Sequence, residues 1–222
     1  ASNMKFGYQG GYLVENDKNF TNNQNLAYRF NNGVPNQITE MITPFDVKQR
    51  VRYDAFYGQE QWTIGRVTLQ GALRFDRSYS WFPAVTVGPT VFLPTAVNYP
   101  ETQGVHSYKD ITPRAGVAWD LFGTGRTSLK VNYGQYLQAA QNGLSYAALR
   151  PSGRLTTTVT RAWTDTDGDF FPDCNLQDPL ANNGGDACAQ ISDLGFGTAR
   201  VTSGLDDKLI SGWGVRPGDW QI

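Results

Sequence analysis

The chain has 222 residues and a formal net charge of −1, and its 19 basic and 20 acidic side chains are interspersed. This near-neutral balance gives no reason to expect a nucleic-acid partner. No stretch approaches the roughly 18 uninterrupted apolar residues of a membrane-spanning helix, which excludes a helical membrane protein. The informative signals are therefore the local side-chain patterns.

Residues 4–14 resemble a β-strand, and residues 46–62 form the next strand-like segment. In the second segment, two sets of side chains alternate with a period of two, although less cleanly than further along the chain. One set is Val47, Val51, Tyr53 and Tyr57, and the other is Lys48, Arg50, Arg52 and Asp54. A tight turn at residues 63–66 is expected to lead into the following strand.

Residues 65–82 carry the clearest alternation in the chain. Val67, Leu69, Gly71, Leu73 and Phe75 fall on one face, and Thr68, Gln70, Ala72, Arg74 and Asp76 fall on the other. The segment is about twice as long as a usual soluble strand. A strand that crosses a bilayer at a tilt needs about 9–11 residues, apolar toward lipid and polar toward the lumen, with aromatic residues where the apolar part ends. Tyr79, Trp81 and Phe82 stand at such an end.

Residues 111–122 and 127–136 repeat this design on either side of a Gly-rich turn at residues 123–126. In the first segment Val117 and Trp119 share one face, and in the second Leu129 and Val131 do so. Two such strands joined by a Gly-rich turn predict a β-hairpin. Residues 212–222 are expected to begin a further strand.

The connections between the expected strands are of two kinds. Those at residues 64–66 and 123–126 are short, whereas those at residues 83–109 and 139–210 are long. Bacterial outer-membrane barrels have short periplasmic turns and long extracellular loops. The sequence therefore predicts an all-β fold, namely an antiparallel transmembrane β-barrel segment with long extracellular loops.

Three motifs in these segments resemble the β-barrel of TonB-dependent outer-membrane receptors. Phe56-Tyr-Gly-Gln-Glu-Gln-Trp62 and the following residues 67–76 are similar to the strand pair FxQDxW…LTLNxGLRYD, with Glu60 where the family usually has Asp. Residues 111–123 resemble SPRxGxxYDxxG, and residues 131–136 resemble xxYGxxY. The similarity is closest to the Oar-like group.

The resemblance implies that residues 1–222 are an internal part of one barrel of roughly 22 strands with a plugged lumen. The plug domain, the TonB-contacting segment and the C-terminal strands are expected to lie outside these residues. It also implies TonB-dependent uptake of a solute, such as a siderophore, glycan or peptide, across the outer membrane of a Gram-negative-type bacterium. The implied partners are outer-membrane lipid, the TonB complex and an unknown solute, and no enzymatic activity or required cofactor is implied.

An acidic segment lies within the longest connection. Asp165, Asp167, Asp169 and Asp173 supply four carboxylates, and Gly168 allows a tight turn. Carboxylates gathered in this way are suitable ligands for Ca²⁺. The spacing departs from known calcium loops, because the glycine stands at the fourth position and no glutamate occupies the twelfth. A calcium site is one interpretation, and a solvated acidic turn is the other.

Cys174 and Cys188 are the only two cysteines. In an exported protein, two cysteines that enclose a short Gly- and Asn-rich segment predict a disulfide, which contributes on the order of 3 kcal/mol for a loop of about 15 residues. A zinc or catalytic role is disfavoured, because neither belongs to a CxxC pair and the single His106 is distant in sequence.

Two other classes of protein remain compatible with the sequence. A secreted all-β carbohydrate-binding or adhesion module also combines aromatic strands, a calcium loop and a disulfide. A β-rich glycosidase is the enzymatic alternative and requires paired carboxylates across a cleft. Both predict a compact fold that is soluble without detergent, whereas a barrel wall exposes apolar stripes.

Overall fold

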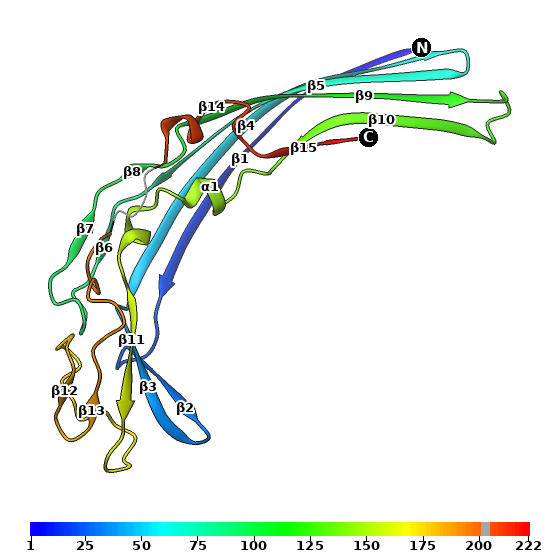
Figure 1. Cartoon of the computed structure of the whole chain (residues 1–222). Helices are drawn as coiled ribbons and strands as arrows, with labels where there is room; N and C mark the ends of the chain where they lie inside the picture. Colours follow the sequence, from blue (N-terminus) through cyan, green and yellow to red (C-terminus); the bar gives the residue numbers. More distant parts are fainter. Residues whose placement is uncertain (201–204) are drawn as a thin grey trace.

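The computed structural model describes residues 1–200 and 205–222 and shows an antiparallel all-β architecture. One large sheet is strongly curved, and a smaller sheet lies beyond one of its ends (Figure 1). The described residues contain no helix that is both long and apolar enough to span a membrane.

Six strands form the body of the large sheet. In spatial order they are β1 (Ser2–Asn19), β4 (Phe45–Ile64), β5 (Val67–Phe82), β9 (Ser107–Asp120), β10 (Ser128–Leu137) and β15 (Gly218–Gln221). Each pairs antiparallel with its neighbour in this order. The described residues do not close the sheet into a barrel, because β1 pairs only with β4. This open wall agrees with the predicted barrel segment.

The two ends of the large sheet differ as the sequence predicts. At the turn end, Gly65 and Arg66 connect β4 to β5, and residues 121–127 connect β9 to β10. The Asp120 carboxylate stabilises the second turn by accepting hydrogen bonds from the backbone N–H groups of Gly123 (3.0 Å) and Gly125 (2.9 Å). At the loop end, residues 20–44, 83–106 and 138–217 form the long connections.

One face of the large sheet is predominantly apolar, and we call it the apolar band; Glu60, which pairs with Met4 and Gly71, is its charged exception. The register places Tyr8, Phe56, Phe75 and Ile111 in its uppermost row, nearest the loop end. Its exposed side chains include Met4, Phe6, Tyr8, Phe56, Trp62, Ile64, Leu69, Leu73, Ile111, Val117, Trp119, Leu129, Val131 and Tyr133. On β5 the band runs from Val67 to Phe75, which matches the nine or so residues of a tilted membrane strand.

The opposite face, which we call the polar face, is partly covered by the last connection. The short helix α1 (Leu144–Ala147) packs on it through Tyr146, which is buried with Val51, Val105 and Tyr108. The Tyr146 hydroxyl lies 2.7 Å from the Ser78 hydroxyl. The last connection therefore folds back over the polar face near the loop end.

The register places the apolar set of β4 on the polar face. Val51 pairs with Ser80 and Tyr53 pairs with Ser78, so these side chains point away from the apolar band. The alternation predicted for residues 46–62 is present, but at the loop end the charged set shares the face of the band. The weaker pattern of this segment has a physical reason, because Tyr146 and Val105 cover Val51.

A buried ion cluster also ties the last connection to the polar face. The Arg216 guanidinium lies 3.1 Å from the Asp110 carboxylate and 3.6 Å from that of Asp76. Asp76 in turn accepts a 2.8 Å hydrogen bond from Arg74. Because a buried charge without its partner is strongly destabilising, the cluster favours the docked position of residues 205–217.

The smaller sheet is built from two of the long connections. Its order is β12 (Asn182–Asn183), β13 (Ala187–Cys188), β11 (Thr158–Thr164), β3 (Val34–Met41) and β2 (Leu26–Asn31). The remaining short elements are β6 (Val85–Val87), β7 (Val97–Tyr99), β8 (Thr102–Gln103), β14 (Ser211–Trp213), η1 (Pro151–Arg154) and η2 (Asp207–Leu209). Figure 1 shows the smaller sheet at the loop end, away from the turns.

Replacing Tyr146 with alanine is expected to release the docked connection. Removing a buried aromatic side chain costs about 3–5 kcal/mol, and Ser78 loses its partner. We expect trypsin to cut the folded full-length protein faster after Arg154, which is followed by Leu155. Leu144→Ala is the matched control, because Leu144 lies on the same helix and is exposed. Equal cleavage rates in the two variants would contradict the assigned docking.

Candidate functional site in the long loops

Two adjoining cavities at the loop end form the candidate site, which we call the loop groove. Their volumes are about 320 Å³ and 370 Å³, and both are lined by Val91, Phe92, Leu176 and Gln177. Each volume lies in the usual range for small-molecule sites, which are mostly apolar with a few polar groups. The loop groove therefore has the size and surface of a binding site.

Phe92 holds the wall of the loop groove between two hydrophobic clusters. It packs against the cluster of the smaller sheet, which includes Ile38 and Trp163, and against the cluster that includes Ile42. Its ring centroid lies 5.9 Å from that of Phe196. Connections that are distant in sequence thus converge on one side chain.

Glu40 supplies the single carboxylate of the loop groove lining. It lies on β3 opposite Val159 of β11, and its side chain is 1% exposed. The Arg161 guanidinium nitrogen Nε lies 2.9 Å from Glu40 Oε1, and the arginine side chain is fully buried. Arg161 Nη2 also donates a 2.6 Å hydrogen bond to the Asp178 carbonyl oxygen. The ion pair thus connects the sheet to the loop that encloses the groove.

Burial raises the pKa of Glu40 from its ordinary value of 4.5 to about 7, although the positive charge of Arg161 opposes the shift. A carboxylate excluded from water is destabilised in its charged form. Neither Glu40 nor Arg161 was predicted from the sequence as a site residue. The sequence does contain a signal for Glu40. It occupies the middle position of the alternating set Ile38, Glu40 and Ile42, and both isoleucines are buried.

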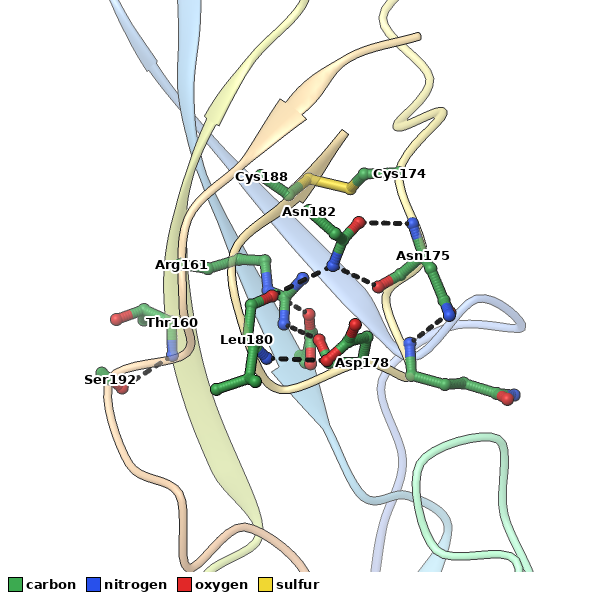
Figure 2. Close-up of polar contacts among 11 residues, drawn as sticks. Thr160, Arg161, Cys174, Asn175, Asp178, Leu180, Asn182, Cys188 and Ser192 are labelled. Carbon is green, nitrogen blue, oxygen red and sulfur yellow. Dashed lines mark hydrogen bonds and ion pairs between the residues drawn. A yellow bond between two sulfur atoms is a disulfide. The ribbon is translucent and has the colours of Figure 1, made fainter. Parts of the chain in front are cut away.

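The disulfide predicted between Cys174 and Cys188 is present and closes the loop beside the groove, with the two Cα atoms 6.1 Å apart. Both residues are buried with Trp163. Figure 2 shows Asn182 crossing the enclosed segment, where its side-chain amide group donates to the carbonyl oxygens of Asn175 (3.1 Å) and Leu180 (3.0 Å). The bridge and these hydrogen bonds fix the loop that carries Leu176 and Gln177.

The acidic segment lies beside this disulfide. The structure brings together carboxylate oxygens of Asp165, Asp167 and Asp169, which lie within 4.8 Å of one another. Gly168 has φ +82°, the left-handed conformation that the predicted tight turn requires. Asp173 is outside this group, and its pKa is raised by loss of solvent and by the neighbouring carboxylates of Asp169 and Asp167.

Asp186 is a structural residue of the same region whose role was not predicted from the sequence. Its buried carboxylate accepts hydrogen bonds from the Trp163 indole N–H (2.8 Å) and the backbone N–H groups of Thr166 (2.8 Å) and Asp173 (3.3 Å). Burial acts to raise the pKa of Asp186, but these hydrogen bonds outweigh it and lower the pKa. Asp186 thus holds both ends of the acidic segment.

The side chains that line the loop groove are mostly apolar. Among the described residues, its lining contains one carboxylate and neither a histidine nor a serine. A glycosidase needs two carboxyl groups facing each other across a cleft, and the lining does not supply a second one. The groove offers apolar contact area with Glu40 as its one ionisable group.

Glu40 is expected to make the smaller sheet less stable as pH rises. Its folded-state pKa of about 7 exceeds the ordinary value of 4.5, so its contribution is complete below pH 4.5 and is lost as pH rises through 7. The change is on the order of 2–3 kcal/mol. Hydrogen exchange of the β3–β11 backbone amides, corrected for intrinsic rates, should show weaker protection at pH 7.5 than at pH 5. Glu40→Gln should remove this difference in protection between the two pH values. Glu101→Gln, at an exposed position, is the control and should retain it. A difference that persists in Glu40→Gln would contradict the assignment of the pH dependence to Glu40.

Calcium binding at the acidic segment stays a prediction, to which the structure adds the proximity of three carboxylates. Titration of Ca²⁺ into the oxidised full-length protein is expected to give saturable heat with a Kd around 10⁻⁴–10⁻³ M. Asp167→Ala should abolish it, whereas Asp207→Ala, at an exposed site on η2, should not. No heat in the native protein, or unchanged heat in Asp167→Ala, would leave a solvated acidic turn.

Comparison with known proteins identifies the family. A family model described as "TonB dependent receptor-like, beta-barrel" matches residues 2–187, from β1 to the start of β13. No curated protein and no solved structure matches the chain. The family match does not distinguish subgroups, so the Oar-like assignment stays a prediction. The members of this family are outer-membrane transport proteins of Gram-negative bacteria. With its open antiparallel wall, its apolar band and its long loops at one end, the chain belongs to the TonB-dependent receptor β-barrel family.

Proposed function

We propose that this protein is an outer-membrane receptor that captures a solute with its long loops and imports it with energy supplied through TonB. The observation that carries the proposal is the apolar band, which extends across β1, β4, β5, β9 and β10 and contains one charged residue, Glu60. A surface of this kind is stable when it faces lipid. The opposite polar face then lines the lumen.

The positions of the loops support an orientation. Short turns face the periplasm and long loops face the cell exterior in outer-membrane barrels. The loop groove is then outside the cell, where it meets solutes before they enter the lumen. Its apolar lining favours a solute with an apolar part, and the amide side chains of Gln24, Asn175 and Gln177 offer polar contacts. The proposal requires a plug domain and a TonB-contacting segment in the full-length protein.

The alternative of a secreted binding module is disfavoured by the same band. Fourteen large apolar side chains of the band are exposed on one face of the sheet. A soluble monomer rarely exposes a contiguous apolar patch larger than a few hundred Å². A secreted module with this sheet would need another partner for the whole face.

Arginine substitutions at two positions of β5 test the proposed lipid contact. Leu73 lies on the apolar band, and Gln70 lies on the polar face near the same depth. In the full-length receptor folded into liposomes, Leu73→Arg is expected to cost roughly 2–4 kcal/mol of unfolding free energy. Gln70→Arg should cost little, because its side chain reaches water. Similar costs at the two positions would refute the lipid contact.

A further inference from the structure

A row of charged side chains lies directly above the apolar band, on the same face of the sheet. The register pairs Asp54 of β4 with Arg77 of β5, and Arg77 with Lys109 of β9. Two residues nearer the turn end, the corresponding row is Phe56, Phe75 and Ile111. The surface thus changes from apolar to charged within roughly 7 Å along the strands.

Arg77 and Lys109 are like charges that lie directly opposite each other on neighbouring strands. Such a pair destabilises a sheet unless an anion lies near it. Among the described residues, neither side chain takes part in an ion pair. The nearest carboxylate in the row, Asp54, already binds Arg52 at 3.2 Å and accepts a hydrogen bond from the Tyr8 hydroxyl. The fold therefore retains two adjacent cations whose repulsion the protein only partly offsets.

Aromatic rings stand beside both cations. The Arg77 guanidinium lies 5.6 Å from the centre of the Tyr79 ring, and the Lys109 ammonium lies 5.9 Å from that of Trp213. Tyrosine and tryptophan are enriched where hydrocarbon meets lipid headgroups, because one part of each ring system is apolar and another is polar. This composition fits the headgroup level of a bilayer.

The same outward face stays predominantly basic further from the band. The charged residues of β1 and β4 on this face above Asp54 are Lys18, Asp46, Lys48, Arg50 and Arg52. Only one of them is acidic, and Asp46 lies 3.7 Å from Lys48. The potential along this face therefore attracts anions and extends the charge of the Arg77–Lys109 pair.

We propose that Arg77 and Lys109 together bind a phosphate group of an anionic lipid in the outer leaflet. The inference rests on the proposed function, in which the apolar band faces lipid. Continuity with the band favours a lipid headgroup over a soluble anion, because a phosphate at this depth is covalently attached to acyl chains that contact Phe75 and Ile111. A bound phosphate would neutralise the cross-strand repulsion, so the lipid would stabilise the wall at this point.

Titration of the full-length receptor with diphosphoryl lipid A in zwitterionic detergent tests the proposal. We expect lipid A to raise the thermal unfolding temperature in a saturable way. Zwitterionic phosphatidylethanolamine and inorganic phosphate, at the same phosphate concentration, should not. The double variant Arg77→Gln/Lys109→Gln should weaken the apparent affinity for lipid A at least tenfold, since each cation near an anionic surface contributes roughly a fivefold effect.

The control removes the same charge elsewhere. Arg126→Gln/Lys208→Gln alters one exposed residue at the turn end and one on η2, and should change the affinity less than twofold. Lys109→Gln alone should raise the unfolding temperature without lipid A, because the repulsion is removed. Equal weakening in both double variants, or no stabilisation by lipid A, would overturn the phosphate site. Stabilisation by inorganic phosphate alone would replace it with a free-anion site.

These results are separable from the proposed function. If Leu73→Arg and Gln70→Arg have similar costs, the lipid contact of the band fails, whatever lipid A does. If Leu73→Arg is selectively costly but lipid A has no effect, the receptor keeps its lipid contact and only the phosphate site is rejected.

Discussion

The cross-strand register is the constraint on which the rest of the structure depends. Because side chains alternate with a period of two, one pairing such as Val51 with Ser80 decides the face of every other residue on both strands. A slip of one residue would turn Leu73 toward the polar face and Arg74 toward the apolar band. The tight turn at Gly65 and Arg66 helps to fix this register, since a two-residue connection allows little slippage.

The register also explains which parts of the fold could be predicted from sequence. Along most of β5 and β9, one alternating set of side chains lies on the apolar band and the other lies on the polar face. Alternation alone therefore identified both strands. At the loop end of β4 the same reasoning became ambiguous. There the face bearing Val51 is covered by Tyr146, from a segment almost a hundred residues later. No local pattern contains that information.

The residues of the loop groove were even harder to predict from local sequence patterns. Glu40 and Arg161 meet because β3 and β11 pair across more than a hundred residues of chain, and neither segment has the length that made β5 recognisable. The disulfide could be predicted, because two cysteines admit only one pairing within the chain. Asp186 could not, because in sequence it resembles the other loop aspartates. Its distinguishing property is burial beside Trp163, which only the fold supplies.

The length of β4 has a consequence for solute capture. Between Phe45 and Asp54 the strand continues beyond the apolar band, and at the usual rise and tilt these residues extend roughly 25 Å from the membrane. Ile42, immediately before this strand, belongs to the cluster on which Phe92 packs. In the proposed orientation, the loop groove is therefore separated from the bilayer by about half the thickness of the membrane itself. Capture and translocation then become successive events at different heights, and a solute released from the groove must still descend along the polar wall before it reaches the lumen within the bilayer.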